Sequence, residues 1–229
     1  MLTRSDFLGA TNGRDTRATP IDLAIFDMDG VLFHGRSFWV DLHHEYGTKV
    51  AGERLTDAYL HDYPKLARFV AGRLWKGRSA IVYRALVESR AYQPGVSEVF
   101  KYLTSKGVRT AILTSGPDLL ASRAQAELGV DAYRANGLGV DTRTDTLTGA
   151  ATIRVPDAEK ARVARELIAE CRTTPGRTAF VGDSAPDAPV ARLVGLSIAY
   201  DPQSEDLARE ADYVVPFGEL TRVIDILRR

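Results

Sequence analysis

Short apolar segments alternate with amphipathic ones along most of the chain. Residues 21–26 are too few for a helix, carry strand-forming side chains at both ends and lead into the turn-forming pair Asp29-Gly30. They therefore predict a buried strand. The same pattern predicts further strands at 108–113, 178–181, 196–200 and 213–215.

Between these segments the apolar residues recur at helical spacing. Residues 37–91 form a helical block without a convincing strand, in which the first apolar stripe is Phe38, Trp39, Leu42 and Tyr46. Later stripes, with Gly or Pro at their ends, predict helices at 96–105, 118–128, 158–171 and 220–227. Residues 138–155 are rich in Thr and Gly and predict a β-hairpin flap.

Strands that alternate with helices indicate an α/β fold with a mostly parallel, Rossmann-like sheet covered on both faces. We expect residues 20–35 and 92–229 to form this core. The block at 36–91 is then a helical domain inserted after the first strand, and residues 1–19 are a flexible tail.

Composition narrows the class of protein. The 229 residues include 30 basic and 30 acidic side chains, so the net charge offers no attraction to nucleic acid or to an anionic membrane. The single cysteine, Cys171, excludes an internal disulfide, and neither a signal peptide nor a membrane span is visible. We expect a cytoplasmic protein without nucleic-acid or membrane partners, and its oligomeric state stays open.

Polar side chains gather where the predicted strands end. Asp27 and Asp29 follow the first strand, Thr114 and Ser115 follow the second, and Asp183 with Asp187 follows a later one. Each group alone fits an ordinary turn or helix cap. Together they favour a ligand site, because the carboxyl ends of parallel strands meet at one edge of the sheet.

Four carboxylates at one edge would repel one another unless a cation lies between them, and oxygen donors favour Mg²⁺. Magnesium held by carboxylates commonly has phosphate oxygens as its remaining ligands. The Thr114 hydroxyl and the backbone amides of Ser115 and Gly116 could bind such a phosphate, and Lys160 could add a positive charge. Lys160 also fits a solvated lysine near the start of a helix.

Four segments in this order resemble the motifs of the haloacid dehalogenase superfamily of phosphatases. They are Asp27-Met-Asp29-Gly-Val31, Ala-Ile-Leu-Thr114, Lys160 and Gly182-Asp183-Ser-Ala-Pro-Asp187. The resemblance covers residues 22–227 and is strongest to the phosphoserine phosphatase-like branch, whose helical cap is also inserted between the first two motifs.

The resemblance implies a role for each residue. Asp27 would attack phosphorus and form an aspartyl phosphate, and Asp29 would protonate the leaving group and then activate water. Mg²⁺ would be bound by the Asp27 carboxylate, the Asp29 backbone carbonyl and the Asp183 carboxylate. Asp187 would be a further ligand or an outer support. Thr114, Ser115 and Lys160 would hold the phosphoryl group.

Two departures bear on the substrate. Where the phosphoserine phosphatases carry a glutamate that reads the substrate ammonium, this chain has Arg36, which favours a carboxylate or a second phosphate on the substrate. Pro186 replaces the usual asparagine before Asp187. We expect a Mg²⁺-dependent phosphatase acting on a small phosphorylated metabolite. A phosphoryl-transferring mutase and a non-catalytic protein that binds a phosphometabolite are the alternatives.

Overall fold

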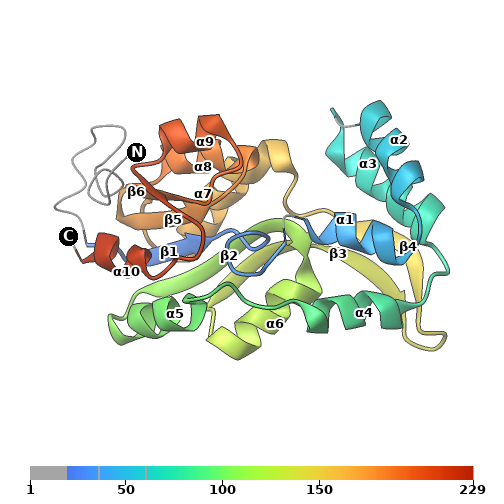
Figure 1. Cartoon of the computed structure of the whole chain (residues 1–229), viewed down its shortest axis with the longest axis horizontal. Helices are drawn as coiled ribbons and strands as arrows, with labels where there is room; N and C mark the ends of the chain where they lie inside the picture. The colour runs from blue at the N-terminus through green and yellow to red at the C-terminus, as the bar shows by residue number, and fades with distance from the viewer. Residues whose placement is uncertain (1–19, 36, 60, 229) are drawn as a thin grey trace.

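The computed structural model describes residues 20–35, 37–59 and 61–228, and within them seven strands form one sheet (Figure 1). Their order across the sheet is β4-β3-β2-β1-β5-β6-β7. The strands are β1 (Leu23–Phe26), β2 (Arg109–Pro117), β3 (Ala132–Asp141), β4 (Thr146–Thr152), β5 (Thr178–Gly182), β6 (Leu196–Tyr200) and β7 (Tyr213–Val215). Neighbouring strands are parallel except β3 and β4, which form an antiparallel hairpin.

The strand β1 lies at the centre and is buried along its whole length. Phe26, its last residue, is opposite Ile112 of β2 and Val181 of β5. The residues that follow β1 and β5, and those at the end of β2, therefore come together at one edge of the sheet. Alternation of side chains along β1 also separates two cores, because Leu23 and Ile25 face one way and Phe26 the other.

Helices cover both faces of this sheet (Figure 1). One face packs against α5 (Val96–Ser105), α6 (Asp118–Leu128) and α10 (Arg222–Leu227). The second face packs against α7 (Lys160–Glu170) and α8 (Ala188–Leu193), with α9 (Glu205–Glu210) beside them. Three single turns of 3-10 helix complete this part of the chain: η3 (Asp157–Glu159), η4 (Pro175–Arg177) and η5 (Ala185–Asp187).

The elements between β1 and α5 are all helical, and we call them the inserted helices. They are α1 (Phe38–Glu45), α2 (Lys49–Tyr59), α3 (Tyr63–Phe69), the π-helix η2 (Val70–Trp75) and α4 (Ala80–Ser89). They lie around the β3–β4 hairpin at one end of the molecule (Figure 1). Backbone hydrogen bonds join the two parts, from Gly77 N to Leu147 O and from Leu147 N to Arg78 O, both at 2.8 Å.

The α/β fold with a mostly parallel sheet is the one that the sequence predicts. Helices α5 and α6 and strands β6 and β7 have the predicted ends. The hairpin is present, but its first strand starts at Ala132 rather than at 138, because Ala132 and the next residues pair with β2. The strand predicted at 108–113 is β2, which runs on to Pro117. The last helix, α10, starts at Arg222 rather than at 220.

Some parts of the structure and of the prediction cannot be matched to each other. The sequence did not predict the helices α8 and α9, since six residues are too few to show a helical period. The predicted tail at 1–19 and Arg36 lie outside the described residues. The division into a core and an inserted domain of 36–91 stays a prediction. No helix in the described ranges has both the length and the apolar character that crossing a bilayer requires.

Truncation of Phe180 tests the core. This side chain of β5 is fully buried against β1 and α7, so Phe180→Ala should lower the free energy of unfolding by about 3–5 kcal/mol. Phe217→Ala is the matched control, because Phe217 is 56% exposed and its loss should change the same quantity by about 0.5 kcal/mol or less. Urea denaturation measures both, and similar losses in the two variants would contradict this account of the core.

Candidate active site

The edge of the sheet at which β1, β2 and β5 end holds a cavity of about 70 Å³. Six of the side chains singled out in the sequence line it: Asp27, Asp29, Thr114, Ser115, Lys160 and Asp183. Asp187 lies directly behind Asp183, and Arg36 is outside the described residues. Ser37, which precedes α1, and Trp39 of α1 also line the cavity.

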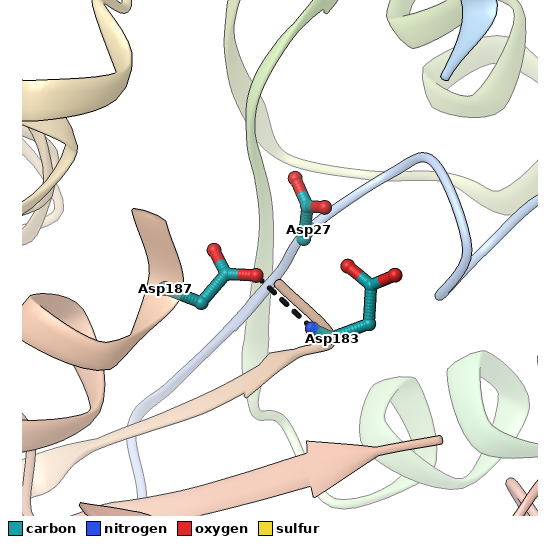
Figure 2. A group of neighbouring side chains, drawn as sticks. All are labelled: Asp27, Asp183 and Asp187. Atoms are coloured by element: carbon teal, nitrogen blue, oxygen red, sulfur yellow. Dashed lines mark hydrogen bonds between the residues drawn. The ribbon is translucent and has the colours of Figure 1, made fainter. Parts of the chain in front are cut away.

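Three carboxylates meet at this edge (Figure 2). Asp27 follows β1, Asp183 follows β5, and Asp187 belongs to η5, yet one oxygen of each lies within 4.8 Å of the others. All three residues are buried. The pairing of β1 with β5 thus brings Asp27 to Asp183 and Asp187, from which it is far apart in the sequence.

Asp187 organises the loop that carries Asp183. Its Oδ2 accepts a hydrogen bond of 3.0 Å from the backbone N–H of Asp183 (Figure 2). The same oxygen accepts hydrogen bonds of 3.0 Å from the backbone N–H and from the hydroxyl of Ser184. Its Oδ1 is 2.6 Å from Nζ of Lys160. Asp187 therefore supports the Asp183 loop and lies beside Lys160, and metal binding by this carboxylate stays a prediction.

Lys160 is the first residue of α7 and is buried. Its ammonium group lies 2.8 Å from Oδ1 of Asp27 and 2.6 Å from Oδ1 of Asp187. The alternative of a solvated lysine is therefore wrong. The two carboxylates raise the pKa of Lys160 despite its burial, so the side chain stays charged.

One ammonium group does not balance the acidic groups around it. Burial raises the pKa of Asp27 to about 7, although Lys160 acts against this rise, and burial with repulsion from Asp27 and Asp187 raises the pKa of Asp183 to about 9. The cluster thus has more acidic groups than cations, and its carboxyl groups ionise only at a cost that a bound cation would offset. That combination fits a hard divalent cation such as Mg²⁺.

Gly30 allows the first motif to approach this cluster. Its φ of +81° lies in the left-handed region, and a Cβ atom there would lie 2.3 Å from Oδ2 of Asp183. A larger residue would therefore both strain the turn and displace a carboxylate.

Asp29 connects the cavity to the inserted helices. Its Oδ2 accepts a hydrogen bond of 2.8 Å from the backbone N–H of Phe38, the first residue of α1. Its Oδ1 is buried and has no partner among the described residues. Burial raises the pKa of Asp29, and the Phe38 N–H opposes this rise. A carboxyl group in this setting holds a proton more readily than one in water.

Thr114 and Ser115 end the apolar part of β2. The Thr114 hydroxyl oxygen accepts a hydrogen bond of 2.9 Å from the backbone N–H of Gly116, so its proton is directed elsewhere. The Gly116 amide thus has a partner within the chain, and its binding of a phosphate stays a prediction. The Ser115 carbonyl accepts hydrogen bonds of 2.9 Å from Nε1 of Trp39 and from Nδ2 of Asn136.

Sequence reasoning missed the part that Trp39 and Asn136 play. Trp39 joins α1 to β2, and Asn136 of β3 also accepts the backbone N–H groups of Arg154 (2.8 Å) and Val155 (2.9 Å). Asn136 thereby fixes the chain just before α7, which carries Lys160. The Asn-Gly pair at 136–137 was visible in the sequence, but its partners come from distant segments.

Comparison with known proteins places the chain in a family. The family model of haloacid dehalogenase-like hydrolases matches residues 21–195. A phosphoserine phosphatase of Idiomarina loihiensis is 29% identical over 212 residues, which are 90% of this chain and 94% of that protein. One of Albidiferax ferrireducens is 25% identical over 230 residues, with coverage of 93% and 92%.

Solved structures agree on the fold. A phosphoserine phosphatase with an analogue of a phospho-aspartyl intermediate superposes with a TM-score of 0.77 at 21% identity, over 91% of this chain and 99% of that one. The fold, the match to the family model and the arrangement of the buried carboxylates agree with one another. The chain therefore belongs to the haloacid dehalogenase-like hydrolases and is a phosphatase of that family.

Proposed function

We propose that this phosphatase hydrolyses a phosphomonoester of a small metabolite through an aspartyl phosphate on Asp27. The observation that carries the proposal is the meeting of Asp27, Asp29 and Lys160 in one cavity at the ends of the central strands. Relatives named phosphoserine phosphatases support a small phosphorylated substrate. The proposal keeps the cytoplasmic setting that the sequence predicts.

Asp27 acts as the nucleophile. Lys160 contacts Oδ1 of Asp27, which leaves Oδ2 to attack phosphorus. The ammonium group also opposes the rise in the Asp27 pKa, and it offsets charge on the phosphoryl oxygens. Thr114 donates its hydroxyl proton to one of these oxygens, since its lone pair already accepts the Gly116 N–H.

Asp29 acts as the general acid and then as the base for water. Its raised pKa suits a group that must hold a proton before the leaving alkoxide departs. The hydrogen bond from Phe38 fixes one carboxyl oxygen, so the partnerless oxygen carries the proton.

The carboxylates of Asp27 and Asp183, with the backbone carbonyl of Asp29, would hold Mg²⁺. When bound, the ion supplies positive charge to the phosphoryl oxygens and balances the carboxylates. Asp187 holds the Asp183 loop and Lys160 in place without binding the ion.

Replacement of the nucleophile tests the whole proposal. Asp27→Asn should reduce release of inorganic phosphate by about a thousandfold or more, because an amide does not attack phosphorus. Its melting temperature should stay close to that of the wild type. The measurement is phosphate release in Mg²⁺ and in EDTA from phosphorylated amino acids, glycerates, sugars and nucleotides.

Asp225→Asn is the matched control, since this aspartate of α10 is exposed and far from the cavity in sequence and fold. It should release phosphate at the wild-type rate, and EDTA should abolish that release. Activity of Asp27→Asn within a few-fold of the control would contradict the assignment of the nucleophile.

Asp29→Asn tests the general acid. The amide oxygen can still accept the Phe38 N–H, but the side chain cannot deliver a proton as the acid does. We expect kcat/KM, which reports the formation of the aspartyl phosphate, to fall by about 10²–10⁴-fold for an alkyl phosphate and much less for acetyl phosphate, whose leaving group needs little protonation. Equal losses of kcat/KM for the two substrates would contradict the role of Asp29 as the acid.

Lys160→Met tests the charge balance in the metal-free protein. The variant leaves Asp27 and Asp187 buried without their shared cation, so the free energy of unfolding should fall by about 3 kcal/mol. Lys101→Met on the exposed side of α5 is the control and should change it by about 0.5 kcal/mol or less. Denaturation in EDTA measures both, and a neutral Lys160→Met would show that the pair adds nothing to stability.

A further inference from the structure

A second cavity, of about 240 Å³, lies next to the catalytic one. Ser37 and Trp39 line both, so the two spaces meet at the start of α1. The walls of the larger cavity come from the inserted helices and from the β3–β4 hairpin with the segment after it. A group leaving phosphorus in the small cavity has this space beside it.

Apolar side chains make up most of the wall. Leu66 and Val70 come from α3 and η2, and Leu138 and Ile153 come from the hairpin side. The indoles of Trp39 and Trp75 stack with ring centroids 6.0 Å apart. The cavity therefore offers a ligand apolar and aromatic surface from several elements.

The polar atoms of the aromatic residues are already engaged. Nε1 of Trp39 donates to the Ser115 carbonyl at 2.9 Å, and Nε1 of Trp75 donates to Oγ1 of Thr48 at 3.2 Å. The Tyr63 hydroxyl donates to the same Ser115 carbonyl at 3.4 Å and accepts from Asn136 at 3.3 Å. These rings offer their apolar surface to the cavity, because their polar groups are hydrogen-bonded within the protein.

Charge is nearly absent from the wall. Among the described residues that line the cavity, Asp157 carries the only formal charge, and none is lysine or arginine. His43 bonds through Nδ1 to Thr48 at 2.8 Å, and burial lowers its pKa, which favours the neutral ring. A carboxylate on the ligand would lose its water here, find no cation among these residues and face Asp157.

We propose that this cavity binds the alcohol part of the substrate and selects an uncharged, apolar alcohol, such as a branched or aromatic one. The inference rests on the proposed phosphatase function and names its substrate class. It differs from the anionic substrate expected from Arg36, a residue outside the described part of the chain. The alcohol part of phosphoserine carries both an ammonium and a carboxylate. The proposed substrate class therefore sets this chain apart from its relatives that are named for phosphoserine.

The first experiment compares kcat/KM for 2-phenylethyl phosphate, O-phospho-L-serine, 3-phosphoglycerate and phosphocholine. We expect 2-phenylethyl phosphate to exceed each of the others by about tenfold or more. All four are esters of aliphatic alcohols, and the charged groups of the serine ester make its alkoxide the better leaving group, so intrinsic reactivity does not produce the expected order. An equal or higher value for any charged ester overturns the inference.

The second experiment changes the wall. Ile153→Thr places a hydroxyl in the cavity, and the ratio of kcat/KM for 2-phenylethyl phosphate to that for acetyl phosphate should fall about tenfold, mainly through KM. Ile81→Thr is the matched control on α4, where the side chain is 61% exposed, and this ratio should not change. An unchanged ratio in a folded Ile153→Thr protein contradicts the proposal.

Acetyl phosphate tests the phosphatase function independently of the apolar selection, because its small acyl part does not fill the larger cavity. Asp27-dependent release from acetyl phosphate together with a preference for charged esters overturns the apolar selection alone. Absence of Asp27-dependent release from every ester and from acetyl phosphate overturns the phosphatase proposal, and the apolar selection with it.

Discussion

The arrangement of this protein around its site depends on a buried cluster of acidic groups at the end of β1. Asp27, Asp183 and Asp187 come within one small volume because β1 and β5 end at the same level and η5 follows β5, and Lys160 supplies one positive charge beside them. Such a cluster is unfavourable without a cation, since each carboxylate gives up water and repels its neighbours. Apolar packing of the fully buried strands β1 and β5 offsets this cost.

Two hydrogen bonds join the candidate active site to the first of the inserted helices. The carboxylate proposed as the acid also accepts the first N–H of α1, and Trp39 of the same helix bonds to the carbonyl beside Thr114. The position of α1 is therefore tied to the protonation and orientation of Asp29. One helix start thus borders both the reacting phosphate and the space proposed for the alcohol.

The sequence predicted the parts of the site that follow from strand order. Asp27, Thr114 and Asp183 each come directly after or within an apolar strand, and parallel pairing brings such positions together without further information. It also predicted Lys160 through a resemblance. It could not predict the partners of Asn136 or the use of the Gly116 amide, since these depend on contacts between distant segments. The sequence could not predict the apolar cavity either. Its walls come from distant segments, and the residues of each wall alone resemble ordinary core.

The β3–β4 hairpin fixes one wall of the larger cavity. β3 runs from its pairing with β2 into the hairpin, and the hairpin in turn shares backbone hydrogen bonds with residues 77–80. That side of the cavity is thus an extension of the central sheet and opens only if sheet-like bonds break. The segment that joins η2 to α4 is therefore held to the sheet by backbone hydrogen bonds as well as by side chains.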